Sequence, residues 1–273
     1  MIDAGMLDEL LQAAPVFLLV AVRALALIEV APLLSSEAVP QAAKLALAGF
    51  AAYAAYPAAG AQGWGAVDAS SLSFVFMIAG EAVIGLIIGF YMTIVFTAFS
   101  TAGQFFAFQM GFSMAESFDP LSQVENPLMG QYLNLVAMLI FLAMGGFQTL
   151  FLGGFQRSLE TINIAALAQG REAVLQMLLS GLSQLFLDAA VIAMPVMGTL
   201  FLISLATGLI SKAAPQINIL AEGFPISIGV AFMLILATLP FMVEAFGRVI
   251  DTGFQSIKDL YIQIGRPIGG GGV

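Results

Sequence analysis

The sequence predicts an all-α, integral-membrane-class bundle of long, kinked helices and helical hairpins. Of its 273 residues, 60% are hydrophobic and only 9% are charged, whereas soluble domains average about 25% charged residues. Several apolar runs approach or exceed the ~20 residues that cross a hydrocarbon core of ~30 Å. A segment surrounded by lipid must satisfy its own backbone hydrogen bonds, so these runs are expected to be helical.

Six apolar segments are expected along the chain. The fifth would extend about 57 Å as one helix, nearly twice the thickness of the hydrocarbon core. Pro195 lies inside it and is the predicted break, because proline removes a backbone donor and clashes one turn back. The third is also too long for a simple span if it continues through Phe108. The six segments cover residues 15–34, 42–59, 72–99, 132–155, 173–210 and 224–246.

The basic residues do not indicate a membrane orientation. Simple alternating spans would concentrate Lys and Arg in every second connection. Here they follow the first, fourth, fifth and sixth segments, and two central connections lack them. The sequence therefore predicts that the helices are not all simple spans.

Small residues predict close helix contacts. Gly85 and Gly89 form a GxxxG pair, the spacing that lets two helix backbones approach each other in a membrane. The alternative is that glycine is simply common in membrane helices.

Five charged residues lie within or at the ends of the apolar runs. A charge at the bilayer centre costs about 2.5 to 3.5 kcal/mol on insertion scales. One interpretation is an ion path in which Glu81 and Asp188 titrate. The favoured interpretation is assembly, in which each charge pairs with an opposite charge on a neighbouring subunit. The third interpretation is a buried ion pair, or a charged side chain near a helix end that extends to the membrane surface. The residues are Arg23, Glu29, Glu81, Asp188 and Glu244.

Composition excludes several kinds of chemistry. The chain has no cysteine and no histidine, which removes thiolate metal sites, Cys or His nucleophiles and a histidine base. No phosphate-binding GxxxxGK[ST] motif is present, and a net charge of −9 argues against a nucleic-acid partner. We expect no enzyme, no catalytic residue, no metal and no cofactor. An intramembrane protease is disfavoured because the paired aspartate contexts are missing as well.

Four blocks of sequence together resemble the FliR/SctT family of the type III export gate. The third contains "QMGFSMAESFDPLSQVENPLMGQ", and the last contains "SKAAPQINILAEGFP". Each block alone is weak, but their order is specific and they span most of the chain. The blocks are residues 23–48, 80–90, 109–162 and 208–234.

The resemblance implies a structural part of the flagellar protein export gate. Such proteins occur as one copy with several FliP and FliQ subunits, in a helical assembly through which unfolded flagellar substrates pass. FlhA, FlhB and the basal-body ring are the other implied partners, and the implied location is the bacterial cytoplasmic membrane, within the flagellar basal body. Residues 1–170 would be FliP-like, residues 171–260 a FliQ-like hairpin, and residues 261–273 a flexible glycine-rich tail.

The resemblance also implies that residues 110–127 form a plug in the lumen. Methionine and phenylalanine side chains fill irregular apolar spaces, glycine permits unusual backbone angles, and Asp-Pro and Asn-Pro pairs stop helices. The alternative from the residues alone is an ordinary helix connection. The predicted plug residues are Met110, Gly111, Phe112, Ser113, Met114, Phe118, Asp119, Pro120, Asn126 and Pro127.

A second proline-containing block predicts a helix, a break and another helix. Pro215 and Pro225 bracket Asn218 and Gly223, and these residue types interrupt helices or form turns. The resemblance makes this block part of the FliQ-like hairpin. A different class of function stays open beside the export gate, namely a proton- or ion-coupled transporter or channel that uses Glu81 and Asp188.

Overall fold

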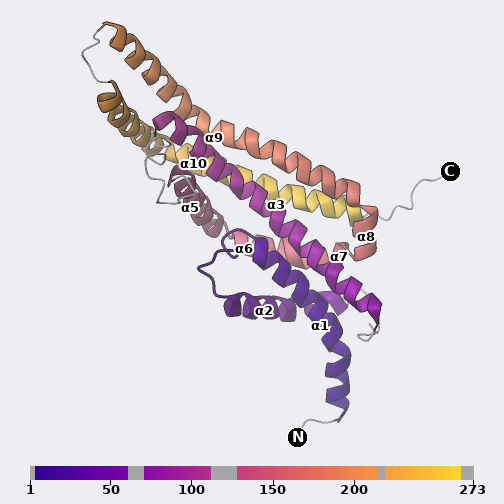
Figure 1. The fold of residues 1–273 in the computed structure, drawn as a ribbon. Coiled ribbons are helices and arrows are strands. Elements are labelled where there is room, and N and C mark those ends of the chain that lie inside the picture. Colours follow the sequence, from indigo (N-terminus) through magenta and orange to yellow (C-terminus); the bar gives the residue numbers. More distant parts are fainter. Residues whose placement is uncertain (1–3, 61–70, 112–127, 214–218, 266–273) are drawn as a thin grey trace, which may run out of the picture. The chain divides into compact units, whose positions relative to one another are not determined.

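The computed structural model describes residues 4–60, 71–111, 128–213 and 219–265, and within these ranges every regular element is a helix (Figure 1). The all-α prediction is therefore confirmed. The elements are α1 (Ala4–Val30), α2 (Gln41–Gly60), α3 (Leu72–Met110), α5 (Leu128–Ala143), α6 (Gly146–Gln148), the π-helix η1 (Thr149–Gln156), α7 (Arg157–Thr161), α8 (Ile164–Gln169), α9 (Arg171–Ala213) and α10 (Ile219–Gly265).

Helix boundaries follow local sequence signals. Gly111, with φ 81°, follows the last residue of α3, as a left-handed glycine commonly does after a helix. Gly145, with φ 71°, separates α5 from α6. At the start of α8 the Asn163 side chain accepts a hydrogen bond of 2.8 Å from the Ala166 amide, which satisfies one of the free amides of the first turn.

Four described helices are long and apolar enough to cross a membrane, and a fifth span results if the helices on either side of Gly145 count as one broken span. The chain is thus of the membrane class, and the six predicted apolar segments do not correspond to six candidate spans among the described helices. The segment 42–59 forms α2, which is not among these helices. Besides its alanines it contains Lys44, Tyr53, Tyr56 and Pro57, which make it less apolar. The segment 132–155 is interrupted at Gly145.

The predicted break at Pro195 is not observed, because α9 continues through this residue as a helix. Proline removes one backbone donor, and the remaining ladder on both sides is kept. The Thr199 hydroxyl donates to the Pro195 carbonyl at 3.0 Å.

The last two long helices are α9, which ends at Ala213, and α10, which begins at Ile219. Gly223 and Pro225 lie inside α10, which differs from their predicted part in the break. Pro215 and Asn218 lie outside the described residues. The helix α10 extends to Gly265, so the first residues of the predicted tail are helical.

The chain divides into two compact units, and each contains segments from several helices. Unit 1 comprises residues 1–94, 145–181 and 251–273, and unit 2 comprises residues 95–144 and 182–250. Neither unit is continuous in sequence, because α3, α9 and α10 each contribute to both. These compact units do not coincide with the predicted FliP-like and FliQ-like parts, which are continuous in sequence. The division into those parts stays a prediction.

Candidate functional site: a buried arginine network and the helix ends beside residues 112–127

A fully buried arginine lies at the centre of unit 1. Arg23 on α1 is 0% exposed, and Glu81 on α3 is 2% exposed. The guanidinium Nε of Arg23 donates to Glu81 Oε2 at 2.5 Å, Nη1 donates to the Ser158 hydroxyl at 3.0 Å, and Nη2 donates to the Ile162 carbonyl at 3.0 Å. One side chain thus joins α1 to α3, to α7 and to the residue that follows α7.

Ser158 extends this network by one further bond. Its hydroxyl accepts from Arg23 and donates to the Phe155 carbonyl at 2.6 Å, so it connects the guanidinium to the backbone of η1. A buried charge is tolerated when it is paired and its donors are satisfied. All three nitrogens of Arg23 have a partner here, so the arrangement holds four parts of unit 1 in one geometry.

The Arg23 network lies where α1 and α3 approach each other most closely through glycines. A Cβ at Gly85 would collide with the Arg23 carbonyl oxygen, and one at Gly89 would lie 2.9 Å from the Leu27 carbonyl oxygen. Thr93, four residues further along α3, donates from its hydroxyl to the Val30 carbonyl at 2.7 Å. The GxxxG pair therefore lies on the α1-facing side of α3, and the approach it permits brings Glu81 to Arg23.

The charges predicted to pair with a neighbouring subunit find partners within the chain in two cases. Arg23 pairs with Glu81, and Lys44 Nζ lies 3.1 Å from Glu29 Oε2. For these residues the prediction of an intersubunit pair is corrected. The sequence shows the charges, but it does not show that α1, α2 and α3 pack together.

The two other acidic residues have different surroundings. Asp188 on α9 is half-buried and accepts a hydrogen bond of 2.9 Å from Gln184 Nε2, one turn away on the same helix. Glu244 on α10 is exposed. In the described part of the chain no group of three or more His, Cys, Asp or Glu residues could hold a metal ion.

In unit 2 the first turn of α5 packs against α3 at Gly103, two turns before the last residue of α3. A Cβ at Gly103 on α3 would lie 2.5 Å from the Met129 carbonyl oxygen and 2.7 Å from Gly130 Cα on α5. Only a glycine permits this approach of backbone to backbone. Met110, the last residue of α3, is 0% exposed. The start of α5 is thus held against α3, and the last residue of α3 is buried.

Phenylalanines from three helices form the core beside these helix ends. Phe96 and Phe99 on α3 make an edge contact with 5.8 Å between ring centroids. Phe96 also meets Phe141 on α5 at 5.4 Å, and Phe99 meets Phe246 on α10 at 4.5 Å. Such aromatic pairs contribute about 0.5 to 1.5 kcal/mol beyond the apolar area they bury.

Of the predicted plug residues, the structure describes Met110 and Gly111. The other eight lie outside the described residues, namely Phe112, Ser113, Met114, Phe118, Asp119, Pro120, Asn126 and Pro127.

Ser158 and Tyr261 are two residues that the sequence did not single out. Tyr261 on α10 is 2% exposed, and its hydroxyl donates to the Gly154 carbonyl of η1 at 2.7 Å. The same carbonyl also accepts from the Arg157 amide, so Tyr261 adds a side-chain bond from α10 to the backbone bonding of η1. The sequence signal is weak, because a hydroxyl inside an apolar helix indicates a polar partner without identifying it.

These features define an all-helical, membrane-class protein with a buried charge network and close-packed helix ends. Two groups of known proteins are similar to it in sequence over most of its length. A family model described as bacterial export proteins, family 1, matches residues 14–253. The chain therefore belongs to this family, which includes the flagellar biosynthetic protein FliR and the Yop proteins translocation protein T.

Individual relatives give the extent of the similarity. The chain is 30% identical to flagellar biosynthetic protein FliR of Escherichia coli over 89% of this chain and 91% of the relative. It is 27% identical to FliR of Bacillus subtilis over 95% of this chain and 99% of the relative. Yop proteins translocation protein T of Yersinia pestis is 30% identical over 66% of this chain and 69% of its own length.

Family membership makes the chain a membrane component of the flagellar or type III secretion export apparatus. The family is not enzymatic, as composition predicted. The resemblance stated from the four sequence blocks is confirmed.

Proposed function

We propose that this chain closes the lumen of a flagellar export gate with the segment between α3 and α5. The observation that carries the proposal is the contact between α3 and the start of α5 in unit 2, where Gly103 lies against Met129 and Gly130. Because this contact holds the two helices against each other, the segment that connects them can change its shape without moving them. Its methionine and phenylalanine side chains suit a seal that excludes water.

The proposed assembly contains FliP and FliQ subunits and a single copy of this chain. FlhA, FlhB and the basal-body ring would be its neighbours in the bacterial cytoplasmic membrane, and unfolded flagellar substrates would pass through it. The first part of the chain would be FliP-like, and the two consecutive helices α9 and α10 would be FliQ-like. Support for this boundary comes from α9, which begins at Arg171.

A transporter that uses Glu81 and Asp188 as coupling carboxylates is less well supported. Glu81 is already held by Arg23 at 2.5 Å and is 2% exposed. A carboxylate that carries protons would need a path to water, and this one is enclosed with its counter-charge.

Deletion of residues 113–123 tests the proposed plug. We expect the deleted chain to copurify with coexpressed FliP and FliQ, and we expect cells or vesicles that contain the complex to leak small ions. Replacement of the same residues by a Gly/Ser sequence is the control for loop length. Because it lacks the apolar side chains, it should leak as well.

Two results would contradict the proposal in different ways. A deleted complex as tight to ions as wild type would remove the plug role while leaving the export assembly intact. Failure of the unmodified chain to copurify with FliP and FliQ would remove the proposed assembly itself.

A further inference from the structure

Four buried phenylalanines in unit 2 connect α10 to the two helices that flank residues 112–127. Phe246 of α10 is 0% exposed, and its ring centroid lies 4.5 Å from that of Phe99 on α3. Phe99 is in edge contact with Phe96, and Phe96 meets Phe141 of α5 at 5.4 Å. The ring contacts therefore run without interruption from α10 through α3 to α5.

The face of α3 that meets Phe246 continues to the end of the helix. Phe99, Gly103, Phe106 and Met110 follow one another at intervals of four, three and four residues, which places them on one side of the helix. Phe106 and Met110 are 0% exposed, and the start of α5 lies against Gly103. Phe246 therefore packs at the beginning of the same buried face that holds α5 and ends at Met110.

The residue after Phe246 gives α10 a second contact with this pair of helices. A Cβ at Gly247 would lie 3.4 Å from the Sδ of Met144, the residue that follows α5. Residues 246–247 of α10 therefore contact both α3 and the chain at the end of α5.

We propose that Phe246 is a positioning residue for the closure of the lumen, because its ring holds α3 and α5 in the relative position from which the segment between them extends. This role rests on the proposed plug, and it gives α10 a part in supporting that plug. Deletion of a buried ring leaves a cavity that the surrounding structure fills only in part by moving. Loss of the Phe246 ring should therefore shift α3 relative to α5.

Double electron–electron resonance between two spin labels tests the position of these helices. The chain has no cysteine, so its labels attach only at Phe108→Cys on α3 and Leu135→Cys on α5, in a complex whose other subunits lack cysteine. Both positions are exposed, at 75% and 57%. We expect one narrow distance distribution with Phe246 present and a shifted or broader one in Phe246→Ala.

Ion leakage from vesicles that contain the complex tests the effect on closure. Phe246→Ala should raise the leak rate about tenfold, because one aromatic pair weighs up to about tenfold on an equilibrium between two arrangements. Phe246→Leu keeps most of the apolar volume and should change both readouts less, and it replaces the alanine variant if that variant does not assemble. Phe99→Ala combined with Phe246→Ala should leak no more than either change alone, since the ring pair is lost only once.

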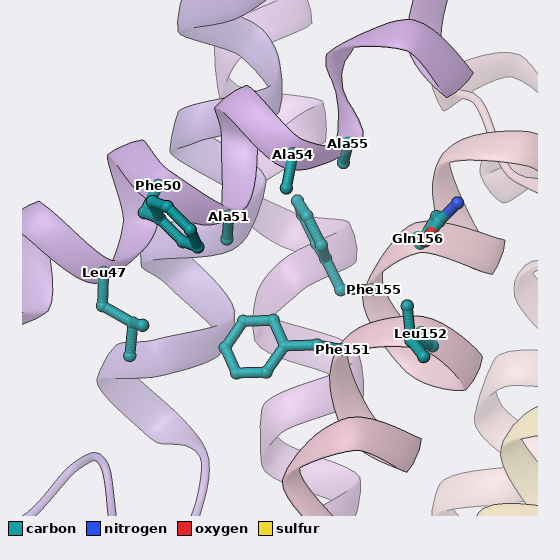
Figure 2. A pocket seen from close by; sticks show the side chains of 9 residues that line it. All are labelled: Leu47, Phe50, Ala51, Ala54, Ala55, Phe151, Leu152, Phe155 and Gln156. Atoms are coloured by element: carbon teal, nitrogen blue, oxygen red, sulfur yellow. The ribbon is translucent and has the colours of Figure 1, made fainter.

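Two variants are the controls for loss of a phenylalanine ring. Phe241→Ala makes the same change on α10 at a side chain that is 73% exposed. Phe151→Ala removes a ring from an aromatic pair in unit 1, where Phe151 meets Phe155 at 6.3 Å beside an apolar pocket lined by α2 and η1 (Figure 2). Both controls should keep the wild-type label distance and leak rate, although Phe151→Ala should lower the thermal midpoint.

Three results would overturn the role of Phe246. An unchanged label distance in Phe246→Ala would show that its ring does not position α3 and α5. A changed distance in a complex that stays tight would separate the position of the helices from closure. Equal leakage from Phe246→Ala and Phe151→Ala would make the effect one of general stability. Failure of the plug is recognised separately, since a complex without residues 113–123 would then stay tight whatever the label distance shows.

Discussion

The Nε of Arg23 donates to Oε2 of Glu81 over 2.5 Å, although the two residues are 58 positions apart in sequence. Both are almost completely buried. Ser158 and the Ile162 carbonyl complete the hydrogen bonding of the guanidinium. The pair therefore fixes α1 against α3 and both against the segment that follows η1.

Removal of one partner of this pair should be strongly destabilising. Glu81→Ala leaves the charge of Arg23 buried without a counter-charge, which typically costs about 3 to 5 kcal/mol. Thermal unfolding in detergent, followed by circular dichroism, should show a lower midpoint. Replacement of both partners by apolar residues, Arg23→Met with Glu81→Leu, should recover most of the loss. Glu244→Ala is the control, because Glu244 is exposed. Equal midpoints for Glu81→Ala and Glu244→Ala would argue against a structural role for the pair.

A methyl group at Gly85 should separate α1 from α3. The Cβ would collide with the Arg23 carbonyl, which is backbone and cannot turn aside, and we expect Gly85→Ala to cost about 1 to 3 kcal/mol. Gly198→Ala is the matched control, because a Cβ there meets nothing within 4 Å. It should be neutral or stabilising by up to about 1 kcal/mol through helix propensity. The measurement is again the thermal midpoint, and a neutral Gly85→Ala would show that the two helices separate at little cost.

Gly103→Ala should disturb the base of the proposed plug. The new Cβ would lie 2.5 Å from the Met129 carbonyl oxygen, so α3 and α5 must move apart at the start of α5. We expect higher ion leakage from vesicles that contain the complex. Gly208→Ala, where a Cβ meets nothing within 4 Å, should leave leakage unchanged. A destabilised but tight Gly103→Ala complex would limit this contact to a structural role.

Tyr261→Phe should loosen η1 without changing its apolar packing. The Gly154 carbonyl loses its hydroxyl donor but keeps the Arg157 amide as a donor, so the loss of this one hydrogen bond should cost about 0.5 to 1.5 kcal/mol. Hydrogen exchange of the amides in residues 149–156 should become faster. Tyr53→Phe serves for comparison, because Tyr53 is 74% exposed. Unchanged exchange in Tyr261→Phe would mean that η1 keeps its geometry without this bond.

The sequence carries a signal for the close approach of α3 to α1. The apolar run 42–59 is a different case, because the helix α2 that it forms is not a candidate membrane span. The GxxxG spacing of Gly85 and Gly89 is a local property that survives in the fold, because helix geometry places both glycines on one face. The apolar run 42–59 is equally local, yet the helix that it forms is not among those apolar enough to cross a membrane. Pro195 is the opposite case, since the helix around it outweighs its local preference for a break.

The partners of buried polar groups could not be read from the sequence. Arg23 and Glu81 each need an opposite charge, and many pairings would satisfy that need. Tyr261 reaches a carbonyl 107 positions away. The π-helix of η1 also has no sequence pattern of its own.

The sequence by itself determined the helical, membrane class of this protein and its family, because apolar content and helix signals act within one stretch of chain. The tertiary structure decided which charge meets which and where α3 lies against α1 and α5. These contacts join residues far apart in sequence. Their energy depends on distances that exist only once the helices have packed.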